Sequence, residues 1–241
     1  MKLLEVQGIS KSFRGLKAVS NASFEVEQGG LVALIGPNGA GKTTCFNMIA
    51  GVFAPDAGTI LFQNLPIQNL RPDQVCVAGI GRTFQIVKPF AGLSVLDNVM
   101  VGSFLKEKTS HGARKVALEI LQKLNLDAKA NLPASTLTLP DRKRLEVARA
   151  LATRPKLLLL DEVMAGLRPT ECDLMVDVFR DLNRADGLTI LLIEHVMRAV
   201  MALAQKVVVL HHGEIIARGA PADVVRDPAV LECYLGEETV V

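Results

Sequence analysis

A glycine-rich turn after a short apolar run constrains the fold of this chain more than any other feature of its sequence. Residues 31–35 (LVALI) have the length and apolarity of a buried strand, and residues 36–43 (GPNGAGKT) match G-x-x-x-x-G-K-[ST] at every fixed position. Gly36, Gly39 and Gly41 permit positive φ angles, so backbone N–H groups can approach phosphate oxygens where the next helix begins. The segment therefore predicts a phosphate-binding loop between a strand and a helix.

The same pattern predicts how the loop would hold a nucleoside triphosphate. We expect Lys42 to neutralise the β- and γ-phosphates and the Thr43 hydroxyl to ligate Mg²⁺. The alternative, a glycine-rich turn without a ligand, is weakened by the strand that precedes the loop. The predicted nucleotide-binding residues of the loop are Gly36, Pro37, Asn38, Gly39, Ala40, Gly41, Lys42, Thr43 and Thr44.

Composition excludes several other classes of protein. The chain has 241 residues, 49% hydrophobic and 22% charged, which is typical of a folded domain with a sizeable core. A net charge of +2 gives no indication of nucleic acid as a partner, and the longest apolar runs are far shorter than a membrane-spanning helix. The start of the chain lacks the pattern of a signal peptide, so we expect a cytoplasmic protein. The cysteines show no CxxC spacing, which favours reduced thiols over disulfides or a metal site.

The pattern of strands and helices changes along the chain. Residues 3–10 and 22–26 alternate as in an antiparallel subdomain, whereas strands and helices alternate between residues 156 and 210, as in a mostly parallel sheet. The intervening part has helical periodicity. We therefore predict an α/β fold, a P-loop NTPase core with an N-terminal antiparallel β-subdomain and an inserted α-helical subdomain. The single domain would span residues 1–241, with the core in 1–85 and 153–241 and the helical subdomain in about 86–152.

Two carboxylates follow another apolar strand, residues 157–162 (LLLLDE). The carboxyl end of a parallel strand is where α/β folds bind ligands. We expect Asp161 to lie beside the Mg²⁺ and Glu162 to polarise the water that attacks the γ-phosphate. A plain strand end before a solvated loop is the alternative, and the phosphate-binding loop upstream favours the catalytic interpretation.

From about residue 3 to residue 236 the chain resembles the nucleotide-binding subunits of ATP-binding cassette (ABC) transporters. The landmarks occur in the family's order: Phe13 in KSFRG, the phosphate-binding loop, Gln85 in RTFQ, a signature region before LEVARAL, LLLLDE, and His195 in LLIEH. The resemblance implies that Phe13 stacks on adenine, that Gln85 senses Mg²⁺ and the attacking water, and that His195 contacts the γ-phosphate. Each of these three side chains could instead have an ordinary structural role.

The signature region departs from the family's Leu-Ser-Gly-Gly-Gln. It reads LTLPD here, in which Thr138 keeps a hydroxyl for the γ-phosphate while Leu139 and Pro140 replace the glycines. Proline has no N–H to donate, so we expect weaker capture of ATP by this segment. The resemblance thus implies catalytic roles for Glu162, His195 and Gln85, nucleotide contacts by Phe13 and Thr138 beside the loop, and metal contacts by Thr43, Gln85 and Asp161.

Basic residues mark two further places. Arg168 in AGLR replaces the acidic or amide residue usual after the second carboxylate of the family. We interpret Arg142, Lys143 and Arg144, which follow the signature region, as the solvated face of a helix.

Further segments resemble the LivG-type ATPases of branched-chain amino-acid importers: RGLKAV, GIGRTFQ, SVLDNVMVG, IEHVM and YLGEE. The resemblance implies a peripheral subunit at the cytoplasmic face of the cell membrane that binds ATP and Mg²⁺. It implies as partners a homologous ATPase subunit in a heterodimer or homodimer, two permease subunits, and indirectly an external substrate-binding protein. Four apolar residues suit contact with the permeases, although they could equally pack in the core: Ile86, Val87, Pro89 and Phe90.

In that arrangement each ATP lies between one chain's phosphate-binding loop and the other's signature. We therefore expect the site built on Lys42, Asp161, Glu162 and His195 to be competent when a partner supplies a good signature, and the site facing LTLPD to be weaker. Alternatives are an ATPase for another cargo, such as urea, an amide or a lipopolysaccharide precursor, and a nucleotide-gated subunit that barely hydrolyses ATP. A cassette acting on nucleic acid is disfavoured by the near-neutral charge.

Overall fold

The computed structural model describes residues 1–84 and 88–235 and contains two sheets. The larger sheet has the strand order β10-β9-β3-β8-β7-β6, and only the β10–β9 pair in it is antiparallel. Its strands are β3 (Leu31–Ile35), β6 (Ile80–Arg82), β7 (Leu157–Asp161), β8 (Thr189–Ile193), β9 (Lys206–His211) and β10 (Glu214–Gly219). Every residue of β3, β7 and β8 is buried, which explains their uninterrupted apolar sequences.

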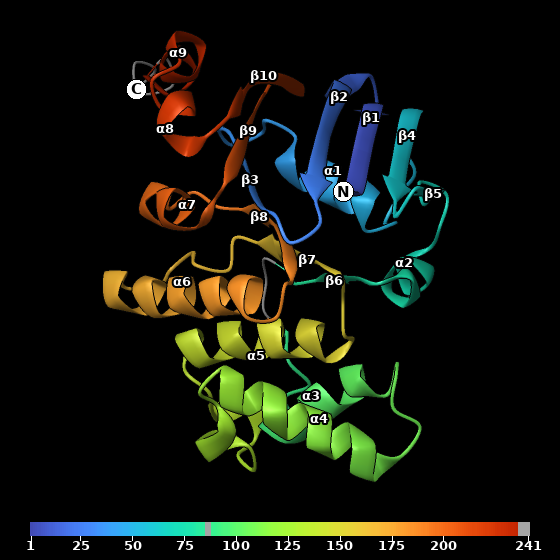
Figure 1. Ribbon diagram of the computed structural model, residues 1–241, viewed down its shortest axis with the longest axis vertical. Helices are drawn as coiled ribbons and strands as arrows, with labels where there is room; N and C mark the ends of the chain where they lie inside the picture. The colour runs from blue at the N-terminus through green and yellow to red at the C-terminus, as the bar shows by residue number, and fades with distance from the viewer. Residues whose placement is uncertain (85–87, 236–241) are drawn as a thin grey trace.

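The smaller sheet is antiparallel, with the order β2-β1-β4-β5. It consists of β1 (Lys2–Phe13), β2 (Leu16–Glu27), β4 (Ala57–Phe62) and β5 (Leu65–Pro66). Buried and exposed residues alternate along much of β2, as expected for a sheet with one solvated face. The buried face packs against α1 (Lys42–Ile49), because Leu4, Phe46 and Leu34 belong to one hydrophobic cluster. Helix α1 thus lies between the two sheets (Figure 1).

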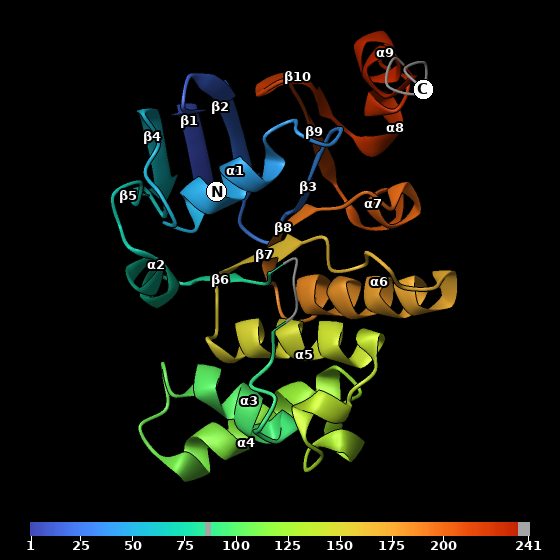
Figure 2. The same ribbon diagram turned by 180° about the vertical axis from the view of Figure 1, so that it is seen from behind.

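The helices on the other side of the larger sheet form successive layers below it in Figures 1 and 2. First comes α6 (Pro169–Arg184), then α5 (Leu139–Ala152), and then α3 (Val95–Ser103) with α4 (Ser110–Lys123). Ser94 caps α3 by accepting a hydrogen bond from the Asp97 backbone amide. The remaining elements are α2 (Pro72–Ala78), α7 (Met197–Leu203), α8 (Pro221–Val224), α9 (Pro228–Leu235) and short 3₁₀ turns at Asp127–Lys129 and Ala134–Thr136.

The predicted fold class is confirmed. Helix α5 begins at Leu139, so Pro140 lies in its first turn. Proline is tolerated there because the first N–H groups of a helix have no intrahelical acceptor. Within the described ranges, no helix is long and apolar enough to cross a bilayer.

Candidate nucleotide-binding site

The phosphate-binding loop has the backbone that its glycines predict. Gly36, Gly39 and Gly41 have φ angles of 148°, 79° and 102°. A Cβ atom at Gly36 would lie 2.0 Å from the Leu210 carbonyl oxygen, and one at Gly41 would lie 2.3 Å from the Ala18 carbonyl oxygen. Two of the glycines are therefore required both by conformation and by the close approach of neighbouring backbone.

The phosphate-binding loop leads directly into the N-terminal end of α1. No side chain of the described residues caps this end, where Gly41 is the N-cap residue, so the first N–H groups of α1 are available to an anion. Lys42 is buried, and its Nζ donates to the carbonyl oxygens of Gly36 and Pro37 at 2.7 and 2.8 Å. Thr43 is exposed. Burial raises the pKa of the Cys45 thiol to about 12, so this cysteine is a packing residue.

Glu162 and His195 lie together at the carboxyl edge of the parallel sheet. They follow the neighbouring strands β7 and β8, and His195 Nε2 is 2.6 Å from Glu162 Oε1. The Glu162 backbone has a φ of 49° and donates its N–H to the Ile193 carbonyl oxygen at 3.0 Å. The turn after β7 therefore aims this carboxylate across to the end of β8, so the structure brings these two predicted catalytic residues together.

Asp161 is held in a buried setting beside them. Its side chain is 2% exposed, and Oδ2 accepts a hydrogen bond from Arg82 Nη2 at 2.9 Å. Burial raises the pKa of Asp161, against the opposing effect of the Arg82 guanidinium. Oδ1 is buried and has no hydrogen-bond partner among the described residues. A carboxylate oxygen in this state suits a hard divalent cation such as Mg²⁺, so the residues present fit the predicted metal.

Lys143 is a residue of the site that sequence reasoning missed. It is buried, and its Nζ donates to the Glu162 carbonyl oxygen at 3.1 Å. Burial lowers the pKa of Lys143, while the nearby carboxylates, Glu194 foremost, oppose that shift. The predicted solvated face is therefore wrong for Lys143. Its helical spacing to Val147, four residues later on the buried side of α5, was the signal that could have found it.

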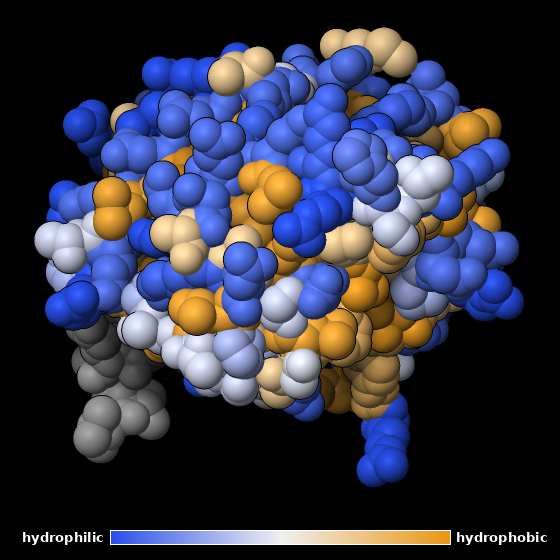
Figure 3. All heavy atoms as spheres, turned by 90° about the horizontal axis from the view of Figure 1, so that it is seen from below, coloured by the Kyte–Doolittle hydropathy of each residue, from blue (hydrophilic) through white to orange (hydrophobic). Residues whose placement is uncertain are grey.

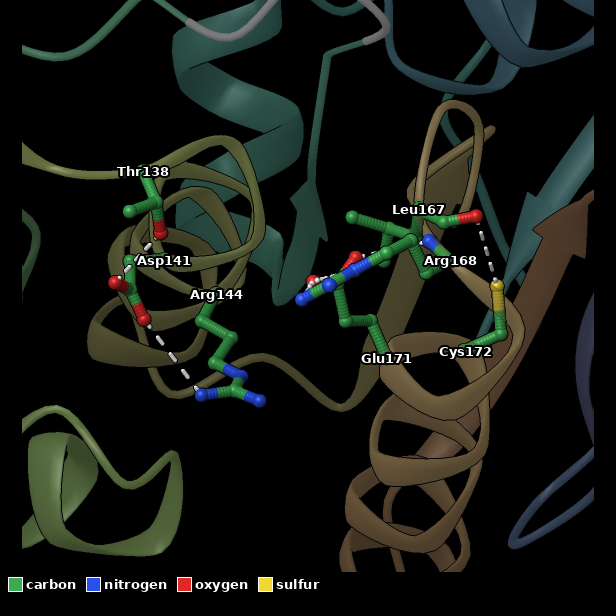
Figure 4. A network of polar contacts seen from close by, with 7 residues as sticks. All are labelled: Thr138, Asp141, Arg144, Leu167, Arg168, Glu171 and Cys172. Carbon is green, nitrogen blue, oxygen red and sulfur yellow. Dashed lines mark hydrogen bonds and ion pairs between the residues drawn. The ribbon is translucent and has the colours of Figure 1, made fainter.

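The start of α5 carries the unusual signature sequence (Figure 4). Thr138 is the N-cap residue, and its Oγ1 donates to Asp141 Oδ2 at 2.8 Å. Asp141 also pairs with Lys129 and, at 3.6 Å, with Arg144. The side chain of Arg144 is only 14% exposed, so the prediction of a solvated face is wrong here too.

Arg168 is the N-cap residue of the neighbouring helix α6 (Figure 4). Its guanidinium pairs with Glu171 Oε1 at 2.6 Å, and its backbone N–H donates to Glu171 Oε2 at 2.8 Å. The Arg168 side chain is 80% exposed. The Glu171 carboxylate thus accepts from both the backbone and the guanidinium of Arg168, so the basic replacement braces the first turn of α6.

Phe13 stands at the end of β1 as a partly exposed aromatic surface. The ring is 43% exposed and meets the Phe53 ring edge to face at a centroid distance of 5.3 Å. Its stacking on adenine stays a prediction. The predicted metal and water sensor Gln85 lies outside the described residues.

Two protein-family models match parts of this chain. A family model described as ABC transporter matches residues 19–165. The chain belongs to the ABC transporter family. A second model, described as branched-chain amino acid ATP-binding cassette transporter, matches residues 214–240 of this ABC cassette.

Curated relatives match the ABC cassette over nearly its whole length. The high-affinity branched-chain amino acid transport ATP-binding protein LivG of Escherichia coli strain K12 is 38% identical over 98% of both chains. BraF of Pseudomonas aeruginosa, which carries the same description, is 37% identical over 98% of both. A solved ATP-binding cassette of an ABC transporter in its ADP conformation superposes with a TM-score of 0.89, is 32% identical, and covers 98% of this chain and 99% of its own. The ABC cassette is thus an ATPase subunit by family.

Proposed function

We propose that this chain is the ATP-hydrolysing subunit of an importer for branched-chain amino acids. The observation that carries the proposal is the contact of 2.6 Å between His195 and Glu162, at the edge of the sheet where the phosphate-binding loop also begins. The cargo is proposed from the relatives named LivG and BraF and from the match at the carboxyl end of the chain.

Different residues of the site bind the phosphates, accept the proton of the attacking water and hold the metal. The N–H groups at the start of α1 and Lys42 bind the phosphates, for which Lys42 Nζ leaves its two backbone acceptors. Glu162 accepts a proton from the attacking water while His195 orients that carboxylate and contacts the γ-phosphate. Thr43, Gln85 and Asp161 would hold Mg²⁺, which when bound stabilises negative charge on the phosphate oxygens.

The transporter supplies the partners in this proposal. The chain acts as a single ABC domain, with the core in residues 1–85 and 153–241 and the helical subdomain in about 86–152. A homologous ATPase subunit completes each site, with Thr138 facing its nucleotide, and two permeases hold the pair at the cytoplasmic face of the membrane. An external substrate-binding protein delivers the cargo to them.

A groove suited to a permease helix lies between α2, β6 and α5. It encloses about 280 Å³ and includes Val75, Phe84 and Val101 in its walls. Phe84 and Val101 are 56% and 48% exposed, and Phe90 nearby is 45% exposed. Apolar residues also lie among charged ones on the lower end of the molecule (Figure 3). An apolar helix that covers the groove would bury these side chains.

Reconstitution with the membrane partners tests the proposal. Glu162→Gln should keep ATP binding and lower turnover by about 100-fold or more, because the general base is lost. Glu119→Gln on the exposed side of α4 is the control and should behave as wild type. Unchanged turnover in Glu162→Gln would show that the assigned base is wrong. Vesicles that hydrolyse ATP but take up no leucine, isoleucine or valine would show that the cargo is another one.

A further inference from the structure

The Arg82 guanidinium joins three elements of the nucleotide site. From β6, its Nη2 donates to Asp161 Oδ2 on β7 at 2.9 Å and its Nη1 donates to Asn47 Oδ1 on α1 at 2.6 Å. The Arg82 side chain is 11% exposed. A planar guanidinium with two fixed acceptors has little freedom to rotate, so this fork defines where the Asp161 carboxylate lies.

The next residue holds the main chain of the same aspartate. The Asp161 N–H donates to Thr83 Oγ1 at 3.1 Å, and the Thr83 N–H donates to the Leu159 carbonyl oxygen at 2.9 Å. Arg82 itself is paired with Leu159 in the parallel register of β6 and β7. Consecutive residues of the edge strand thus fix the side chain and the backbone of Asp161.

The contacts of Arg82 and Thr83 with Asp161 leave one carboxylate oxygen of Asp161 for a ligand. Arg82 occupies Oδ2, whereas Oδ1 is buried without a partner in the part of the chain that the structure describes. We propose that Arg82 is a positioning residue that fixes Asp161 so that Oδ1 takes the divalent cation of the nucleotide complex. The proposal rests on the proposed ATPase function and adds to it the residue that orients the metal carboxylate.

Arg82 also connects the metal carboxylate to the surface groove. Its Cζ lies 5.4 Å from the centre of the Phe84 ring, and both residues line the groove between α2, β6 and α5. Phe84 is 56% exposed, so a helix that docks in the groove covers a ring that is stacked on Arg82. The Arg82 side chain therefore contacts both the carboxylate that would bind the metal and the ring that a docked helix would cover.

Metal binding, measured without turnover, tests this role. The full chain is loaded with the non-hydrolysable analogue AMP-PNP, and the affinity of the complex for Mn²⁺ is followed by electron paramagnetic resonance. Arg82→Lys keeps the charge and loses the fork, and Asn47→Leu removes the second anchor while Arg82 remains. We expect each variant to bind AMP-PNP in EDTA as wild type does and to lose about tenfold or more in Mn²⁺ affinity.

The controls separate this role from a general loss of structure. Arg180→Lys changes an arginine that pairs with Asp177 on the surface of α6 and should leave Mn²⁺ affinity unchanged. Wild-type Mn²⁺ affinity in Asn47→Leu and in folded Arg82→Lys would overturn the proposal while leaving the ATPase function intact. A wild-type chain that binds no AMP-PNP would instead refute the proposed function itself.

The connection to the groove has its own test. Phe84→Leu keeps an apolar side chain and removes the aromatic face, so Mn²⁺ affinity should fall by about two- to fivefold. No change in this variant would refute the connection to the groove.

Discussion

Replacement of Lys143 by methionine tests whether α5 supports the catalytic carboxylate. Methionine has nearly the same length and volume, so Lys143→Met opens no large cavity. It removes the hydrogen bond of 3.1 Å to the Glu162 carbonyl oxygen. It also removes a buried cation that faces the carboxylates of Glu194 and Glu162. These two carboxylates lie close enough to raise the pKa of Lys143 against the lowering effect of burial.

The expected loss of stability follows from that single contact. A hydrogen bond from a charged donor contributes about 1.5–3 kcal/mol, and Lys143 is only 5% exposed, so little of it is replaced by water. For a domain of this size, such a loss lowers Tm by roughly 3–12 °C. We also expect kcat to fall by about ten- to a hundredfold with KM for ATP unchanged, because Glu162 shifts while the phosphate-binding loop does not.

Calorimetry of the isolated chain and steady-state ATPase assays of the assembled transporter measure the two effects. Arg142→Met is the matched control, since it makes the same kind of change at the adjacent, exposed position of α5. Equal Tm and kcat in Lys143→Met and Arg142→Met would refute the reasoning. A fall in Tm with unchanged kcat would refute the support of Glu162 alone.

Two other predictions concern the loop and a buried acid. Gly36→Ala should abolish ATP binding because its Cβ would lie 2.0 Å from the Leu210 carbonyl oxygen. A Cβ at Gly39 would meet no atom of the described residues within 4 Å, so Gly39→Ala should cost only about 1–2 kcal/mol in urea unfolding; equal effects of the two variants would contradict the geometry. Burial raises the pKa of Glu194 from 4.5 to about 7, so its share of stability is full below pH 4.5 and is lost as the pH rises through about 7. Wild type should lose up to about 3 kcal/mol more than Glu194→Gln over that range, and parallel pH profiles in urea unfolding would rule this out.

The sequence predicts the strands and the loop well because their signals are local. Buried strands such as Leu157–Asp161 read as uninterrupted apolar runs, and the positive φ angles of the loop follow from its glycines. The contact between Glu162 and His195 was also accessible, since both follow strands of one parallel sheet.

What the sequence does not show is which polar residues turn inward. Arg82 and Lys143 look like surface residues, because their partners lie far away along the chain: Asp161 for Arg82 and the Glu162 backbone for Lys143. Only the packing of β6 and α5 against β7 brings these groups together. The signal of Pro140 is ambiguous for a related reason, since a proline indicates a break in a helix unless it lies in the first turn.

Pro140 has a consequence for how the unusual signature can be studied. Pro140 lies in the first turn of α5, where backbone N–H groups have no acceptor within the helix. Its missing N–H therefore costs the folding of its own chain almost no stability. In the assembly that we propose, the donor is missing instead from the nucleotide of the other subunit. The two copies of a homodimer would share this deficit equally, whereas a partner with a complete signature would confine it to one of the two sites. Because of Pro140, the partner therefore determines whether the two nucleotide sites of the assembly lack this donor equally or differ in it.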